Sequence, residues 1–226
     1  MFFDEYYLIL VVPTLILSLW AQFMVKSTFA KYSKILCSRN VTGMDAASLL
    51  LKSNSINNVR IEPVQGSLTD HYDPSAKIVR LSQPVYGNNS IAAVGVAAHE
   101  TGHAIQHAIK WGPLALRSTL VPVANIGSSL GPWIAIAGIG LGYPLLLNIG
   151  IFLFSGAVLF YVITLPVEFN ASNRAIAILR QNNVLSEQEL KGVKKVLTAA
   201  ALTYVASALT AIASLLRLIL LSRRRR

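Results

Sequence analysis

The residues best suited to chemistry are two histidines in an HExxH motif that runs from His99 to His103. Residues 90–109 around the motif contain no proline and predict a helix. Residues four apart share one face of a helix, so both imidazoles can bind one metal ion, and Glu100 can reach a water on that metal. Zinc suits this pattern because it takes imidazole and carboxylate ligands and keeps one position open in catalytic sites. The motif therefore predicts a zinc-dependent hydrolase.

Composition indicates that this motif belongs to a membrane protein. Hydrophobic residues make up 54% of the 226 residues and charged residues only 13%, well below the roughly 25% charged residues of ordinary soluble domains. Residues 6–25 form an uncharged run that is long enough to cross a hydrocarbon core of ~30 Å. Acidic residues precede this run, and neither a basic region nor a cleavage site accompanies it. It therefore predicts an uncleaved anchor rather than a signal peptide.

Two further regions predict additional membrane spans. Residues 118–167 contain no Asp, Glu, Lys, Arg or His, and their length fits two spans joined by a turn at Gly142-Tyr143-Pro144. Residues 196–216 are a fourth candidate, and their many small residues favour close helix packing. The chain is therefore expected to cross the membrane three or four times.

The polar remainder consists of residues 26–117 and 168–195. In the first piece, Thr42 and Asp45 predict a capping box for a helix over residues 44–53. Two stretches alternate in polarity like strands, with turn signals between them, and these are residues 59–64 and 77–82. The predicted order is therefore helix, strand, strand and then the HExxH helix.

The net charge of +10 follows the pattern of cytoplasmic segments in a membrane protein. Basic residues follow the first hydrophobic run at Lys26, Lys31, Lys34 and Arg39. This asymmetry predicts that residues 26–117 are cytoplasmic, and a two-span hairpin returns residue 168 to the same side. Nucleic-acid binding is not needed to explain the charge. A full fourth span would place residues 223–226 outside, against the positive-inside rule. The number of spans therefore stays open, and so does a role of the basic tail in binding lipid headgroups.

The third metal ligand distinguishes the classes of zinc hydrolase. His107 continues the stripe of histidines, but it lies about 12 Å from His99 along the helix, whereas a ligand nitrogen must lie within ~2.1 Å of zinc. His107 is therefore interpreted as a polar residue on the same face, partly exposed or adjacent to the ligands. An extended metzincin motif would need Gly at 106 and His at 109, where this chain has Gln106 and Ile109.

Glu168 is the carboxylate that stands out, because it ends the uncharged run 118–167. A carboxylate at the mouth of a membrane span is costly unless it is solvated or paired. The residues alone leave two interpretations open: Glu168 binds the metal, or it marks the membrane boundary.

Four stretches of the chain resemble the YugP-like neutral zinc metallopeptidases of bacteria. They are residues 1–4 (MFFD), 68–74 (LTDHYDP), 90–100 (SIAAVGVAAHE) and 165–172 (LPVEFNAS). The likeness runs over essentially the whole chain and implies a multi-pass membrane protein with a zinc peptidase site. The last stretch also resembles the third-ligand helix of the HtpX-like and Oma1-like membrane proteases, in which a Glu binds zinc and an Asp four residues later supports a zinc histidine. This likeness implies that Glu168 is the third ligand, while Ser172 replaces the Asp and leaves its role unassigned.

The fold class expected on these grounds is a mainly α integral membrane protein with three to four transmembrane helices and a small α+β catalytic domain that carries a gluzincin-like HExxH helix. The expected divisions are an N-terminal transmembrane anchor (1–25), a polar catalytic domain (26–117), a transmembrane hairpin (118–167), a third-ligand helix segment (168–195) and a C-terminal hydrophobic helix with a basic tail (196–226).

The expected activity is that of a membrane-bound zinc endopeptidase of the bacterial cytoplasmic membrane, with its active site on the cytoplasmic side. Zn²⁺ would be held by His99, His103 and Glu168, and Glu100 would act as general base when water attacks a peptide carbonyl. His71 and Tyr72 are candidate hydrogen-bond donors to the site, with a structural role in a turn as the alternative. The expected partners are membrane lipids and protein or peptide substrates near the bilayer.

Two other classes of protein compete with this interpretation. An intramembrane protease of the site-2 type would place HExxH inside a span, but residues 91–98 are a short apolar run, and the chain is polar after Glu100. A non-catalytic scaffold could keep zinc for stability, but structural zinc sites usually have four protein ligands, and the sequence offers three.

Overall fold

The protein is described by a computed structural model that covers residues 4–223; residues 1–3 and 224–226, which include the opening MFF and most of the basic tail, lie outside the described residues. Within the described part, four helices are long and apolar enough to cross a membrane. The first is α1 (Val12–Tyr32), which a π-helical turn, η1 (Tyr7–Val11), precedes. The others are α5 (Gly112–Leu141), α6 (Pro144–Gln181) and α7 (Glu187–Arg223). The prediction of a mainly α membrane protein is thereby confirmed.

The chain divides into two compact units. The helical unit comprises Met1–Gln22, Ala115–Pro166 and Leu202–Arg226, and the mixed unit comprises Phe23–Leu114 and Val167–Ala201. The predicted turn between two spans is present, because α5 ends at Leu141 and α6 begins at Pro144. However, α6 does not end with the uncharged run: it continues through Glu168 to Gln181 as one helix.

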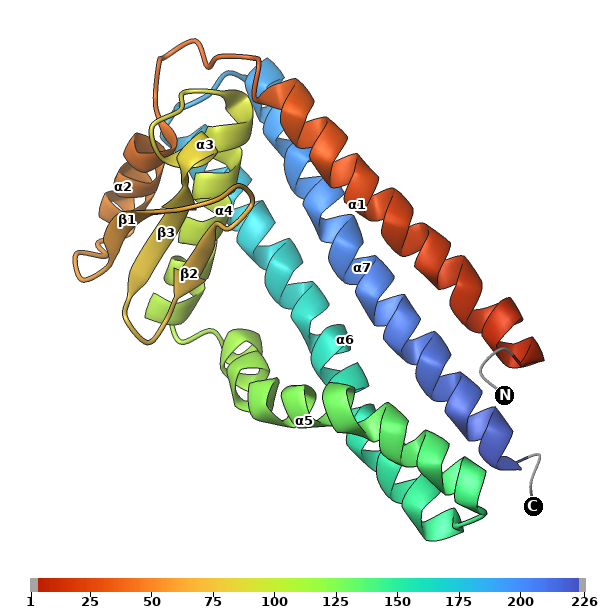
Figure 1. The fold of residues 1–226 in the computed structure, drawn as a ribbon. Coiled ribbons are helices and arrows are strands. Elements are labelled where there is room, and N and C mark those ends of the chain that lie inside the picture. The colour runs from red at the N-terminus through yellow and green to blue at the C-terminus, as the bar shows by residue number, and fades with distance from the viewer. Residues whose placement is uncertain (1–3, 224–226) are drawn as a thin grey trace. The chain divides into compact units, whose positions relative to one another are not determined.

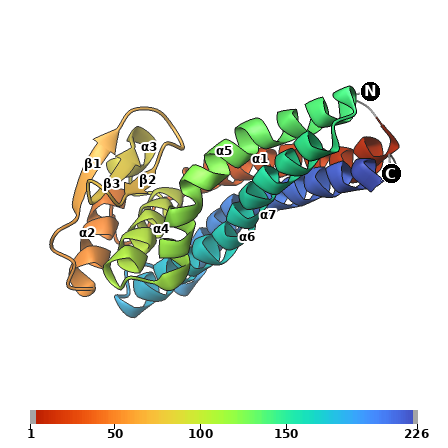
Figure 2. The same ribbon diagram turned by 90° about the horizontal axis from the view of Figure 1, so that it is seen from below.

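Small residues let α5 and α6 of the helical unit approach closely, as is typical of membrane helices. Side chains at Gly127 and Gly150 would overlap the backbone at Leu153 and Ala135, so the backbones of α5 and α6 are in contact. Figures 1 and 2 show α1 and α7 side by side in this unit. The hydroxyl oxygen of Ser18 on α1 lies 3.3 Å from that of Thr210 on α7.

An ion pair in the helical unit joins the residue Asp4, which precedes η1, to the last turns of α7. The Arg217 guanidinium donates to Asp4 at 2.6 and 2.9 Å, and both side chains are largely buried. The guanidinium also lies 5.1 Å from the centre of the Tyr7 ring, which adds a cation–π contact. The start of α1 is therefore fixed to the final turns of α7.

The mixed unit contains a three-stranded sheet and the HExxH helix (Figure 1). The sheet has the order β1-β3-β2, with β1 (Arg60–Val64) parallel and β2 (His71–Asp73) antiparallel to β3 (Ile78–Ser82). The helices are α2 (Gly43–Ser53), the short α3 (Gln83–Tyr86) and α4 (Ile91–Ala108), the last of which carries the motif. Two strands and two helices therefore begin within one residue of the predicted positions, whereas β2 was predicted as part of a turn.

Local interactions explain where these elements begin. Thr42 accepts a hydrogen bond from the Asp45 backbone N–H, and the Asp45 carboxylate accepts one from the Thr42 backbone N–H, so the predicted capping box is confirmed. The Ser90 hydroxyl caps α4 by accepting from the Ala93 N–H. Both caps satisfy N–H groups that have no partner within the helix.

Candidate metal centre

The HExxH helix α4 is buried on most of its surface. Its Ala93 and Ala97 pack against the sheet, while Val94 and Ala98 pack with buried residues of α2, α6 and α7. Because α4 is held on both sides, its two histidines are fixed one helical turn apart. Only 12% of the His99 side chain and 10% of the His103 side chain are exposed to solvent.

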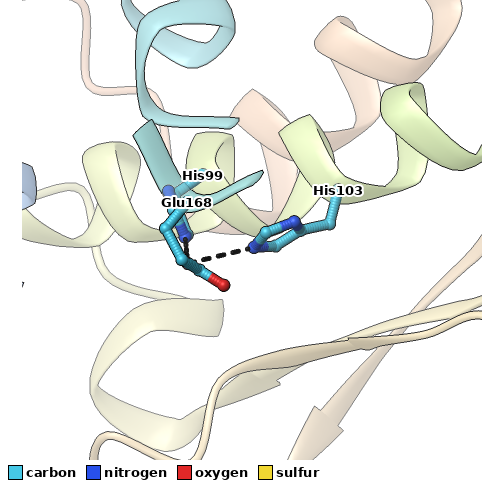
Figure 3. A group of neighbouring side chains, drawn as sticks. All are labelled: His99, His103 and Glu168. Carbon is cyan, nitrogen blue, oxygen red and sulfur yellow. Dashed lines mark hydrogen bonds and ion pairs between the residues drawn. The ribbon is translucent and has the colours of Figure 1, made fainter. Parts of the chain in front are cut away.

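Glu168 on α6 meets both histidines. One carboxylate oxygen of Glu168 lies 3.2 Å from His99 Nε2 and 3.5 Å from His103 Nε2 (Figure 3). A tetrahedral zinc ion with ligands at 2.0–2.2 Å separates its ligand atoms by about 3.3 Å. The two separations from Glu168 therefore fit a zinc ion, all three ligand atoms lie within 4.8 Å of one another, and their chemistry also suits zinc.

The close approach of α4 and α6 brings these side chains together. A Cβ atom on Gly102 would lie 2.7 Å from the carbonyl oxygen of Ala171, closer than real Cβ atoms come. Gly102 thus lets α6 pack directly on α4 between the two histidines. This glycine therefore admits a neighbouring helix.

Gly102→Ala is therefore expected to separate α4 from α6. Overpacking of this kind typically lowers the free energy of unfolding by ~1–3 kcal/mol, although alanine is the better helix former by about 1 kcal/mol. Thermal unfolding in detergent and zinc titration would measure the two effects, and both stability and zinc affinity should fall. The matched control is Gly87→Ala, since nothing lies within 4 Å of a Cβ atom there. Equal stability and zinc affinity in the two variants would contradict the packing role.

Each histidine has a hydrogen-bond partner on the ring nitrogen that faces away from Glu168. His99 Nδ1 lies 3.0 Å from the Ser172 hydroxyl, and His103 Nδ1 lies 3.0 Å from Gln106 Oε1. Ser172, which stands where the resemblance to the HtpX-like and Oma1-like proteases implies an Asp, thus contacts His99 through its hydroxyl. In the sequence, Gln106 stands out only as a mismatch to the metzincin motif, and its contact with His103 was not predicted.

The charges around His103 favour its protonated form. Burial lowers the pKa of His103, but the hydrogen bond to Glu168 and the charges of Glu100 and Glu168 outweigh burial and hold the pKa above the ordinary 6.5. A metal ion requires the Nε2 atom without its proton. A proton and a metal ion therefore compete for the place between His103 and Glu168.

The other sequence candidates lie outside the cluster of three. Glu100 is partly exposed and directly follows His99 on α4. His107 Nδ1 forms a 2.7 Å hydrogen bond with the Tyr72 hydroxyl, which fixes β2 to α4. His71 is exposed and bonds through Nδ1 to the Thr69 carbonyl oxygen. Among the described residues, the groups close enough to share a metal ion are therefore His99, His103 and Glu168.

The polar stretch before and within β2 has the structural role that was considered for it. Asp70 accepts hydrogen bonds from the backbone N–H and the hydroxyl of Ser82, and burial raises the pKa of this carboxyl group. Asp73 accepts from the N–H groups of Ser75 and Ala76 and thereby shapes the turn into β3. These two carboxylates therefore hold the sheet and its turn together.

An HExxH helix with a glutamate from a second helix defines the class of zinc metallopeptidase to which this site is similar. The chain belongs to the family described as "Putative neutral zinc metallopeptidase", whose model matches residues 7–223. It is 49% identical over 215 residues to the "Putative membrane protease YugP" of Bacillus subtilis (strain 168), covering 95% of this chain and 96% of that protein. No solved structure matches the chain. The predicted family is thereby confirmed, and the family and the cluster together indicate zinc as the metal of this membrane protein.

Proposed function

We propose that this protein is a membrane-bound zinc endopeptidase in which His99, His103 and Glu168 hold the metal and Glu100 is the general base. The observation that carries the proposal is the position of Glu168, which reaches both histidines of the motif at zinc-like separations. Three protein ligands leave the fourth position of a catalytic zinc site open. Family membership supports a zinc protease.

Three residues besides the metal ligands have separate roles in peptide hydrolysis. Zinc, when bound, supplies a Lewis acid that polarises the peptide carbonyl and makes water more acidic. Glu100 takes a proton from the attacking water and passes it to the leaving amine nitrogen. Ser172 and Gln106 keep the imidazoles of His99 and His103 in orientation.

We further propose that the substrates are membrane proteins or protein segments close to the bilayer. Four helices qualify as spans among the described residues, and a site attached to them meets substrates near the membrane surface. The relative from Bacillus subtilis carries the name membrane protease, which agrees with this placement. Membrane lipids surround the four helices in this proposal.

The function is tested by hydrolysis of a panel of fluorogenic peptides and loosely folded proteins by the full-length protein in liposomes. Zinc chelation is expected to abolish hydrolysis, and stoichiometric zinc to restore it. Zinc binding without hydrolysis of any substrate would favour the scaffold alternative. The intramembrane alternative has less support, because α4 is not among the helices that qualify as spans in the described part of the chain.

The active site is proposed to face the cytoplasm. Labels placed beside Lys52 and beside Gln181 are expected to report the same side, because both residues belong to the mixed unit. That side should be the cytoplasmic one, since the basic residues after the uncharged run 6–25 follow the positive-inside rule. Accessibility of single cysteines to an impermeant thiol reagent in right-side-out and inverted vesicles measures it. Labels on opposite sides would contradict the metal site, because its two helices could not meet.

A further inference from the structure

We propose that Gln106 is a positioning residue of the metal centre: it fixes which nitrogen of His103 faces the metal and joins that histidine to the helix of Glu168. Gln106 is fully buried on α4, one turn after His103. Its amide makes hydrogen bonds to His103, to the Val167 carbonyl oxygen and to Asn170. A buried polar side chain that is satisfied in this way has a defined orientation.

The partners on α6 determine which end of the amide faces His103. The Val167 carbonyl oxygen can only accept, so the atom of Gln106 that lies 2.9 Å from it must be the amide nitrogen. The contact with Asn170 leads independently to the same orientation of the Gln106 amide. Arg174 can only donate, and its Nε lies 2.7 Å from Asn170 Oδ1, so the Asn170 atom 3.0 Å from Gln106 Nε2 is an oxygen.

It follows that the Gln106 oxygen faces His103. An amide oxygen can only accept, so His103 Nδ1 carries the hydrogen of this 3.0 Å bond. The Nε2 atom of His103, which faces Glu168, is then the nitrogen that is left to bind the metal. The tautomer of His103 is therefore set by a chain of contacts that begins at Arg174.

The same amide also connects the ligands of the two helices. Val167, whose carbonyl accepts from Gln106, directly precedes Glu168 on α6. The backbone next to the third ligand is therefore fixed to the residue that orients the second. His99 differs, because its partner Ser172 is a hydroxyl, which can donate or accept.

The first test is ¹⁵N nuclear magnetic resonance of histidine side chains in the zinc-loaded full-length protein. The expected spectrum contains an imidazole with a protonated, slowly exchanging Nδ1 and a metal-bound Nε2, and this signal is absent in His103→Asn. A His103 that binds zinc through Nδ1, or that carries no proton there, overturns the proposal. Sequential assignment of the wild-type signal to His103 rather than His99 decides the question even if the variant does not fold.

The second test compares zinc affinities, which a chelator competition measures without any peptidase assay. Gln106→Leu is expected to bind zinc ~10–100-fold more weakly, as is typical when the partner of a metal ligand is removed. Gln106→Glu keeps an acceptor for His103 Nδ1 but turns an oxygen toward the Val167 carbonyl and Asn170 Oδ1, which also accept, so it should recover only part of that loss. The matched control is Thr101→Val, which removes another buried hydrogen bond of α4, to the Ala97 carbonyl, and should leave zinc affinity unchanged.

The outcomes separate this inference from the proposed function, on whose metal site it rests. Wild-type protein that binds no zinc overturns both. Wild-type protein that binds zinc while Gln106→Leu binds it equally well overturns this inference alone. Equal losses in Gln106→Leu and Thr101→Val would show a general effect of helix stability and would also overturn it.

Discussion

Replacement of Glu100 by glutamine is expected to reduce peptide hydrolysis by a factor of ~10² or more while zinc stays bound. General acid–base catalysis typically contributes 10²–10⁴, and the glutamine amide cannot take the proton of the attacking water. Zinc should remain because the clustered ligand atoms belong to His99, His103 and Glu168 and not to Glu100. Turnover of a fluorogenic peptide and zinc content per chain are measured on the same liposome preparation.

The matched control for Glu100→Gln is Glu187→Gln at the start of α7. The Glu187 side chain is 67% exposed and pairs with Arg180 on the surface, and such exposed pairs contribute little to stability. Hydrolysis by the control should equal that of the wild type. Full activity in Glu100→Gln would remove Glu100 as the general base.

Loss of Glu168 is expected to have the largest effect on the metal. Glu168→Ala removes the oxygen that lies within 3.5 Å of both imidazoles and leaves two histidines at most. Zinc affinity should fall by several orders of magnitude, below the level at which zinc survives purification, and hydrolysis should cease. Metal analysis and chelator competition measure the loss.

His107→Ala is the informative comparison for Glu168→Ala. His107 lies on the same helix but bonds to Tyr72 and stands outside the cluster. This variant should keep its zinc and lose at most the 10–100-fold that is typical of a residue near the ligands. Zinc that survives the loss of Glu168 but disappears with the loss of His107 would show that the ligand assignment is wrong.

The elements that the sequence predicted well are those with local signals. The HExxH helix is bounded by a capping serine and lacks proline, so its predicted limits differ from the observed Ile91–Ala108 by one residue at each end. The capping box of α2 and the turn before Pro144 are also local, because each depends on residues adjacent in the sequence.

Contacts that depend on two distant segments were not predictable in the same way. Gln106 has no periodic signal, and its importance comes from α6, which lies about sixty residues further along the chain. The strand β2 is three residues long and forms through pairing with β3, while its own sequence favours a turn. The residues alone left the role of Glu168 undecided, since helix proximity is a tertiary property. The resemblance to the HtpX-like and Oma1-like proteases favoured metal binding.

We expect the ion pair between Asp4 and Arg217 to favour the entry of the last helix into the bilayer during synthesis. An arginine at the centre of a transmembrane helix costs roughly 2.5–3.5 kcal/mol on insertion by the translocon. Arg217 lies in the last turns of α7 and so costs less, because a side chain near a helix end can reach the membrane interface. Because Asp4 is synthesised first, α7 emerges from the ribosome when the acceptor for its guanidinium is already present. A chain without α1 loses this bond, so the efficiency with which α7 inserts depends on a helix made almost two hundred residues earlier.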